Sequence, residues 1–194
     1  MFNGIIYNQG VLVSKLINKD RCLIQIMSKI KIGKKDIGSS ISCNGVCLTL
    51  TKYTRNKLSF YVSKETLKRT SFKNIKIGES VNLETSMKFG DGLSGHFIQG
   101  HVDTVGIIKD IKIIDKSWII KIFVNSIYKN NLIEKGSITV NGVSLTISNV
   151  RNTFFKISII PHTLKLTNLI NLKKNKFVNI EFDIFSKYLI KLQN

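Results

Sequence analysis

Apolar and polar positions alternate in short runs along most of the chain, and glycine, asparagine and lysine separate the runs. A period of two residues is typical of strands that bury one face of a sheet. Short strands at this spacing predict a mainly β protein. We expect the strands to close into small antiparallel barrels, because a closed barrel leaves no free sheet edge. The expected strands are 11–13, 22–26, 39–50, 57–62 and 80–83, then 118–124, 137–148, 154–160 and 177–182.

The two series of strands follow an internal repeat. The phrase CNGVCLTL, which starts at Cys43, returns as VNGVSLTI, which starts at Val140, at an offset of 97 residues. KETLKRT and PHTLKLT match at the same offset without a gap, so we infer two copies of one unit. We expect an N-terminal repeat over residues 1–96 and a C-terminal repeat over 97–194, joined within the glycine-rich stretch 88–95.

An Asn-Gly pair lies inside each repeated phrase, at Asn44-Gly45 and at Asn141-Gly142. Asn-Gly between apolar runs is typical of a two-residue hairpin turn. A kink or bulge that brings the backbone close to a ligand fits the same residues. The sequence leaves both alternatives open.

Helical patterns are confined to three places. The segments ETLKRTSF and HTLKLTNL predict a short helix or turn after a strand, with Thr66 and Thr163 as caps. Residues from about 183 onward predict an amphipathic helix with Asp183 at its N-terminal end. We expect its apolar face to dock on its own domain, and self-association is the alternative. That face consists of Ile184, Phe185, Tyr188, Leu189 and Leu192.

Charge is the most unusual bulk property, with 30 Lys and Arg against 12 Asp and Glu, a formal net charge of +18. Such a surface attracts phosphate backbones, so nucleic-acid binding has to be considered. The basic residues are spread along the chain, however, and no nucleic-acid-binding motif is visible. Drift towards the Lys, Asn and Ile codons of an AT-rich gene explains the excess equally well. We therefore expect no specific nucleic-acid partner.

Other bulk features point to a cytoplasmic protein. No apolar run approaches the roughly 18 residues that a membrane helix needs, and MFNGIIYNQG lacks the basic flank of a secretory signal. Three cysteines cannot all pair within one chain, which favours free thiols. Cys43 and Cys47 have the wrong spacing for a zinc knuckle, and His96 and His101 would point to opposite sides of a strand. We expect no metal site and no membrane association.

Candidate chemistry gathers around the repeated phrase. Cys47 in the first copy is replaced by Ser144 in the second, and a threonine follows two residues later, at Thr49 and Thr146. Residues i and i+2 share a face of a strand, so each copy presents two small polar groups. Two related pockets of this kind suit two related flat polar ligands.

His101 could act as a general acid or base with Cys47 as nucleophile. On spacing alone, a structural histidine and an inert core thiol are favoured.

The segments MFNGII, NGVCLT, KETLKRT, GHFIQGHVD, KGSITVNGVSLT, IPHTLKLTNL and VNIEFD together resemble the riboflavin synthase alpha-chain family of two-repeat, lumazine-binding proteins. The resemblance covers essentially the whole chain. It implies two similar small antiparallel (Greek-key) β-barrels plus a C-terminal α-helix that supports a homotrimer. It also implies one molecule of 6,7-dimethyl-8-ribityllumazine in each barrel, with the active site between the N-terminal barrel of one subunit and the C-terminal barrel of another.

The reaction implied by the resemblance is the last step of riboflavin biosynthesis. One lumazine transfers a four-carbon unit to the other, which gives riboflavin and 5-amino-6-ribitylaminouracil without a cofactor or metal. A functional link to lumazine synthase is also implied. The alternative is a noncatalytic lumazine- or flavin-binding protein of the same fold, and the polar residues kept in both pockets favour the enzyme.

Site residues follow from the family motifs position by position. The resemblance assigns catalytic roles to His101, Cys47 and Ser144. The expected N-terminal pocket consists of Gly4, Ile5, Ile6, Cys47, Leu48, Thr49, Tyr61, Val62, Ser63, Lys64, Glu65 and Thr66, followed by Gly100, His101 and Val102. The expected C-terminal pocket consists of Lys135, Ser144, Leu145, Thr146, Ile159, Ile160, Pro161, His162 and Thr163, with Asp183 nearby.

Overall fold

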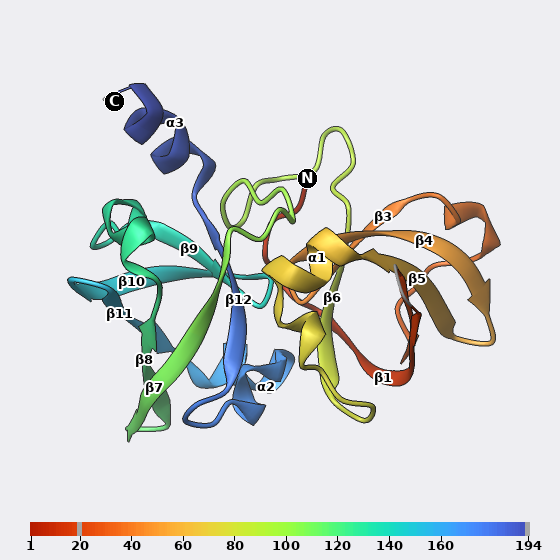
Figure 1. Ribbon diagram of the computed structural model, residues 1–194, viewed down its shortest axis with the longest axis horizontal. Helices are drawn as coiled ribbons and strands as arrows, with labels where there is room; N and C mark the ends of the chain where they lie inside the picture. Colours follow the sequence, from red (N-terminus) through yellow and green to blue (C-terminus); the bar gives the residue numbers. More distant parts are fainter. Residues whose placement is uncertain (19–20, 193–194) are drawn as a thin grey trace.

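The computed structural model describes residues 1–18 and 21–192, which form two closed antiparallel β-barrels side by side (Figure 1). In the N-terminal barrel the strand order is β1-β2-β5-β4-β3-β6. Strands β3, β4 and β5 follow one another and β6 returns beside β3, which is a Greek-key arrangement. The strands are β1 (Asn8–Asn18), β2 (Arg21–Ser28), β3 (Ser40–Cys43), β4 (Val46–Thr54), β5 (Lys57–Ser63) and β6 (Ser80–Thr85).

The C-terminal barrel repeats this topology, with the closed order β10-β11-β8-β7-β12-β9. The expected fold of two similar barrels is therefore confirmed. The strand β7, which contains the polar interruptions Lys109 and Asp110, was not among the expected strands. The strands are β7 (Thr104–Ile114), β8 (Ser117–Phe123), β9 (Ser137–Val140), β10 (Val143–Arg151), β11 (Phe154–Ile159) and β12 (Phe177–Phe182).

Each barrel encloses its own apolar core. Alternate residues of a strand point inward. Leu58, Phe60 and Val62 of β5 are therefore buried in one core, and Phe155 and Ile157 of β11 are buried in the other. The register of each strand is fixed because a slip of one residue would turn this apolar set outward. The alternation of apolar and polar residues along each strand therefore explains why both barrels enclose an apolar core.

The repeated Asn-Gly pairs form hairpin turns. Asn44 and Gly45 have φ values of 48° and 79°, and Asn141 and Gly142 have 47° and 80°. Positive φ at both central residues defines a type I′ turn, whose twist matches that of the flanking strands. Of the two alternatives left by the sequence, the turn is the one observed, between β3 and β4 and between β9 and β10.

Short helices follow β5 and β11, as expected, but their caps differ from the prediction. Helix α1 (Lys64–Arg69) begins after Ser63, whose hydroxyl accepts a hydrogen bond from the amide of Thr66. Helix α2 (Pro161–Leu166) begins with Pro161, whose fixed φ suits the first helical position. Thr66 and Thr163 lie inside the helices. Among the described residues, 3₁₀ helices complete the connections: η1 (Lys34–Asp36), η2 (Ser71–Lys73), η3 (Ser126–Asn131) and η4 (Asn168–Asn171).

The C-terminal helix α3 (Ile184–Leu192) extends away from its barrel (Figure 1). Asp183 lies at the N-terminal end of the helix, as expected, and its carboxylate accepts a hydrogen bond from the amide of Phe185. The expected docking of the apolar face is mostly wrong, because four of its side chains are between 59% and 83% exposed. These are Phe185, Tyr188, Leu189 and Leu192. Within the described residues, no helix is long and apolar enough to span a bilayer.

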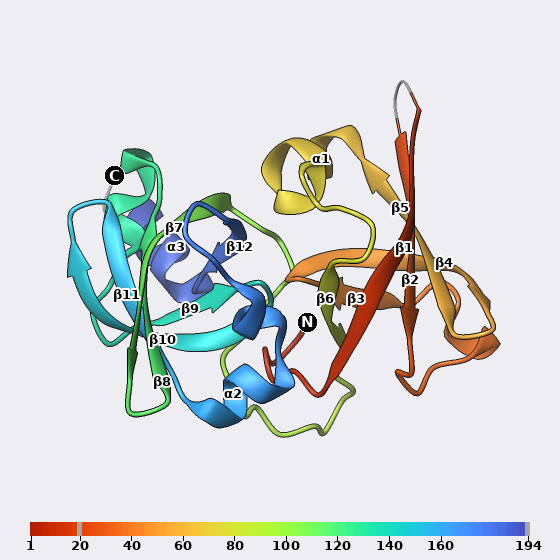
Figure 2. The ribbon, with the colours of Figure 1, turned by 90° about the horizontal axis from the view of Figure 1, so that it is seen from below.

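Two segments ahead of the barrels cross over. We call residues 2–6 arm 1 and residues 98–102 arm 2. Phe2 and Ile98 pair by two backbone hydrogen bonds of 2.8 and 3.1 Å, and the N-terminus lies between the barrels (Figures 1 and 2). Ile6 of arm 1 is buried in the core of the C-terminal barrel, while Val102 of arm 2 packs against the core of the N-terminal barrel. Each repeat therefore contributes an arm to the other, and the division at residue 96 stays a prediction.

Candidate functional site

The repeated polar phrases are covered by the exchanged arms. The carbonyl oxygen of Gly4 in arm 1 accepts a hydrogen bond of 2.9 Å from the amide of Ser144 in β10. The carbonyl oxygen of Gly100 in arm 2 accepts the equivalent bond of 2.8 Å from the amide of Cys47 in β4. The structure thus contains two related sites, the Cys47 site on the N-terminal barrel and the Ser144 site on the C-terminal barrel.

The close approach of the arms requires glycine. Gly4 and Gly100 have φ values of +74° and +77°, which glycine adopts without strain. A Cβ on Gly100 would lie 2.6 Å from Cβ of Cys47, and one on Gly4 would lie 2.6 Å from the amide nitrogen of Ser144. The group that approaches Gly100 is therefore the Cys47 strand, and the group that approaches Gly4 is the Ser144 strand.

Two glutamates hold the arms. The carboxylate of Glu84 in β6 accepts hydrogen bonds from the amides of Asn3 (2.7 Å) and Gly4 (3.0 Å), and that of Glu181 in β12 accepts from Gln99 (2.8 Å) and Gly100 (2.9 Å). Burial raises the pKa of both carboxyls to about 7, although the backbone hydrogen bonds act in the opposite direction. Sequence reasoning missed both residues. Their signal was an identical glutamate at matching places of the repeat, inside apolar strands.

The Ser144 site contains a buried histidine that sequence reasoning also missed. Nδ1 of His96 lies 2.7 Å from the hydroxyl of Ser144, and Nε2 lies 3.1 Å from the hydroxyl of Thr139. Burial lowers the pKa of His96, against an opposing effect of Asp183. A neutral imidazole carries one proton, so it donates to one hydroxyl and accepts from the other. The ring can therefore move a proton to or from Ser144.

The Cys47 site has a different composition. Cys47 is partly exposed, whereas Cys22 and Cys43 are buried. Burial raises the pKa of the Cys43 thiol well above its ordinary value, so Cys43 is a poor nucleophile. His101 follows Gly100 on arm 2, next to the Cys47 strand, and its side chain is exposed.

The polar pairs lie on the outer face of each barrel. Leu48 between Cys47 and Thr49 points into the core, so the pair itself points outward, and Thr49 is exposed. Ser144 and Thr146 share a face in the same way. The expected same-face pairs are therefore present, but each is covered by an arm on one side and open on the other.

Comparison with known proteins identifies the family. The lumazine binding domain model matches residues 3–86 and again residues 99–183. Riboflavin synthase of Photobacterium leiognathi is 40% identical over 99% of this chain and 88% of its own length. Riboflavin synthase of Bacillus subtilis is 37% identical over 98% of this chain and 89% of its own length. The chain belongs to the riboflavin synthase family.

The fold of this riboflavin synthase family member is also that of a solved lumazine-binding protein. The crystal structure of LumP complexed with riboflavin superposes with a TM-score of 0.84 over 94% of this chain and 99% of LumP. Sequence identity is 24%, so this likeness shows the fold alone.

The arms require a correction to the expected pockets of the family. Gly4, Ile5 and Ile6 were assigned to the N-terminal pocket, but arm 1 lies over β10 of the C-terminal barrel. The reason is the crossing of the arms between Phe2 and Ile98, which no local pattern encodes. Gly100, His101 and Val102 lie with Cys47, where they were expected.

The remaining expected residues divide by orientation. Several side chains are buried in the cores, and only their backbone could contact a ligand; they are Ile6, Leu48, Val62 and Ile159. Others are at least partly exposed on the strand ends and on the helices α1 and α2; they are Tyr61, Ser63, Lys64, Glu65, Thr66, Ile160, Pro161, His162 and Thr163. Lys135 is exposed just before β9, with a φ of +66°.

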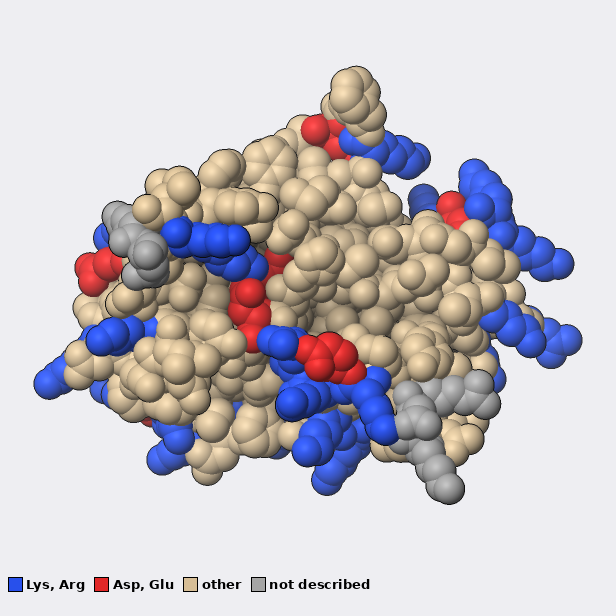
Figure 3. Space-filling model, turned by 45° about the horizontal axis from the view of Figure 1, so that its top comes forward, with Lys and Arg blue, Asp and Glu red and all other residues tan. Residues whose placement is uncertain are grey.

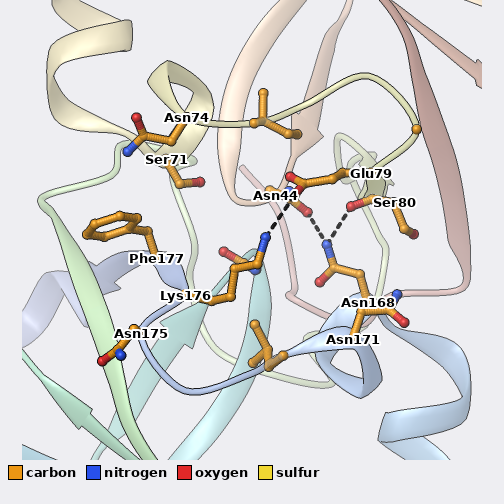
Figure 4. A pocket seen from close by; sticks show the side chains of 14 residues that line it. Asn44, Ser71, Asn74, Glu79, Ser80, Asn168, Asn171, Asn175, Lys176 and Phe177 are labelled. Atoms are coloured by element: carbon orange, nitrogen blue, oxygen red, sulfur yellow. Dashed lines mark hydrogen bonds and ion pairs between the residues drawn. The ribbon is translucent and has the colours of Figure 1, made fainter.

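A cavity of about 540 Å³ is lined by residues of both repeats (Figure 4). Its lining consists of residues related by the repeat, such as Ser71 with Asn168 and Glu79 with Lys176. The latter two form an ion pair of 3.0 Å across the cavity. None of the expected catalytic residues lines this space, so the outer faces at Cys47 and Ser144 remain the candidate active site.

Neither a metal cluster nor a basic patch competes with these sites in the described part of the chain. No group of three or more His, Cys, Asp or Glu residues there could hold a metal ion. Figure 3 shows Lys and Arg side chains in several separate places on one face, with acidic residues beside them. On this face the positive charge is therefore dispersed.

Proposed function

We propose that this protein is a riboflavin synthase that converts two molecules of 6,7-dimethyl-8-ribityllumazine into riboflavin and 5-amino-6-ribitylaminouracil. Family membership at 37–40% identity over nearly the whole chain supports this function. The crystal structure of LumP with 6,7-dimethyl-8-ribityllumazine shows that the fold accommodates this molecule in another protein.

The observation that carries the proposal is the pair of related sites. A reaction between two copies of one molecule needs two sites that bind the same ring but treat it differently. The Cys47 and Ser144 sites meet this requirement, because both have an arm glycine over the strand while only Ser144 has a buried histidine partner. Holding two reactants in register removes much of the entropic barrier of a bimolecular step.

Each polar group has a role in this chemistry. The 7-methyl protons of the lumazine are acidic because the ring delocalises the resulting anion, so a base such as His101 need only assist. Cys47 or Ser144 adds reversibly to the other ring, or positions a water that does so. His96 receives or returns the Ser144 proton at Nδ1. The transfer of a four-carbon unit between identical molecules balances without an external oxidant or reductant.

The open sides of the two sites support a homotrimer. Thr49 and Thr146 are exposed, and so is the apolar face of α3. An apolar face of this kind marks an interaction surface. In the proposed assembly, α3 joins three subunits and the Cys47 site of one subunit faces the Ser144 site of the next. A cytoplasmic location and a functional link to lumazine synthase belong to the same proposal.

Incubation of the purified protein with 6,7-dimethyl-8-ribityllumazine alone tests the function. We expect one riboflavin to form for every two lumazines consumed, measured by absorbance and chromatography. Tight binding without riboflavin formation would refute the enzyme and favour the noncatalytic lumazine- or flavin-binding alternative.

A further inference from the structure

We infer that Glu84 and Glu181 are positioning residues that act crosswise. Each carboxylate belongs to one barrel and fixes the arm that covers the active strand of the other barrel, where the active strands are β4 with Cys47 and β10 with Ser144. The catalytic consequence rests on the proposed function. The positioning itself does not, and it can be measured without substrate.

The connection runs through a single glycine in each case. Gly4 donates its amide to Glu84 of the N-terminal barrel and accepts, through its carbonyl, from Ser144 of the C-terminal barrel. Gly100 does the same between Glu181 of the C-terminal barrel and Cys47 of the N-terminal barrel. Only the backbone of one residue separates each carboxylate from the opposite active strand.

Two convergent donors explain why the residue is a glutamate. Two successive amides of each arm point at the carboxylate, and a carboxylate offers acceptor sites on both oxygens. Glutamine would turn an NH₂ group towards one of these amides and leave it unpaired. A buried donor without a partner loses its hydrogen bond to water without a replacement, so the arm would detach more often.

The position of each glutamate is fixed by its strand. Glu84 lies opposite Ser42 of β3, and Glu181 lies opposite Thr139 of β9. These places are equivalent in the repeat. The charged surroundings differ, because the N-terminal amino group lowers the pKa of Glu84, whereas Lys187 lowers and Asp103 raises the pKa of Glu181.

The crossed arrangement predicts a pattern of amide hydrogen exchange that general destabilisation of the protein would not produce. In Glu84→Gln, hydrogen exchange of the Ser144 amide should accelerate about tenfold or more, because its acceptor Gly4 leaves with arm 1, while the Cys47 amide keeps its wild-type rate. In Glu181→Gln the Cys47 amide should accelerate and the Ser144 amide should not. Both rates are measured by NMR on the full chain without substrate, at one fixed pH well above 7 so that both carboxyls, whose pKa is about 7, are ionised.

A matched control comes from Glu134, an exposed glutamate whose carboxylate also accepts a backbone amide, that of Val150. Glu134→Gln should leave both reporter amides unchanged. Equal acceleration of both amides in Glu84→Gln and Glu181→Gln, or no acceleration in either, would overturn the inference. If a glutamine variant does not fold, aspartate at the same position keeps the charge but withdraws the oxygens, and it should show the same crossed pattern.

Alkylation of Cys47 gives an independent reading on Glu181. Arm 2 lies on Cys47, and the other two cysteines are buried. Iodoacetamide should therefore modify Cys47 several-fold faster in Glu181→Gln than in wild type or Glu84→Gln. Turnover of lumazine is measured separately: we expect kcat to fall in both variants. A crossed exchange pattern in a protein that makes no riboflavin would keep the positioning role and reject the proposed function alone.

Discussion

The backbones of Gly45 and Gly142 pack directly against each other where the two Asn-Gly turns meet between the barrels. A Cβ on either glycine would lie 2.7 Å from the amide nitrogen of the other. The contact is reciprocal, as at an interface related by a two-fold axis. The repeated turns therefore shape each hairpin and also join the barrels.

Buried asparagines extend this junction. The side-chain amide of Asn82 donates to the backbone carbonyl of Asn141, and the side-chain amide of Asn179 donates to the backbone carbonyl of Asn44. The side chain of Asn168 bonds to both Asn44 and Asn82. Because each buried amide has partners, the interface between the barrels is polar yet satisfied, which fixes their relative orientation.

We expect Gly142→Ala to destabilise the protein by about 2–4 kcal/mol. The substitution combines the left-handed strain of a non-glycine residue, about 1–2 kcal/mol, with a clash against backbone that cannot move without separating the barrels. The free energy of unfolding from urea titration measures the effect.

Gly38→Ala is the matched control. Gly38 also has a positive φ, of +93°, but no atom lies within 4 Å of its added Cβ. Only the backbone strain remains, so we expect a loss of about 1 kcal/mol. Equal losses in the two variants would contradict the close packing of the turns.

The barrels and the terminal helix were predictable because their causes are local, whereas the sequence left the Asn-Gly pairs open between a hairpin turn and a bulge. Alternating apolar residues determine which face of a strand is buried, and Asn-Gly favours positive φ. The crossing of the arms was not predictable, since nothing in the sequence around Gly4 says which barrel this glycine contacts. The pairing of His96 with Ser144 joins residues 48 positions apart through the same crossing. The identical Glu84 and Glu181 were visible in the repeat, but their partners were not.

Stability should fall as the pH rises from about 4.5 to about 7 because of Glu84 and Glu181. Burial raises the pKa of each from its ordinary 4.5 to about 7, so in this range the unfolded chain has released protons that the folded protein retains. The upper limit is about 3 kcal/mol for each carboxyl. This sign is opposite to that of a carboxylate in a strong ion pair.

Comparison with the Glu84→Gln, Glu181→Gln double variant isolates this effect. The free energy of unfolding of the wild type should decline relative to that of the variant between pH 5 and pH 7 and then level off. The lowered pKa of His96 adds a slope of opposite sign below pH 6.5, but it is present in both proteins and cancels in the difference. If the free energy of unfolding of the wild type instead rose relative to that of the double variant over this pH range, the raised pKa values would be contradicted.

His101→Ala and Cys47→Ser should lower kcat more than they weaken lumazine binding. His101 is exposed, so its loss should change the free energy of unfolding by no more than about 0.5 kcal/mol. A positioned acid or base contributes about 10²–10⁴-fold to the rate, and removal of one should fall in that range. Steady-state turnover and equilibrium lumazine titration separate the two effects, and normal turnover in both variants would refute these roles.

Exchanging the two polar residues tests whether the sites are specialised. In Cys47→Ser with Ser144→Cys, a thiol replaces the hydroxyl that bonds to His96. A thiol is a weaker hydrogen-bonding group than a hydroxyl, so the imidazole should hold it less firmly in place and kcat should fall. Ser144→Cys alone should account for most of the loss. Unchanged kinetics in the double variant would show that the difference between the repeats has no functional meaning.

The exposed face of α3 should determine the oligomeric state. Leu189 is 59% exposed on this face, and a charge there would have to be desolvated in a trimer. We expect the wild type to sediment as a trimer and Leu189→Glu to sediment as a monomer with an unchanged fold. Lys191→Glu introduces the same side chain at an exposed polar position of the same helix and should remain trimeric. Riboflavin formation should fall with the trimer, because the Cys47 site and the Ser144 site would then no longer face each other. A monomeric wild type with full activity would instead place both lumazines within one chain.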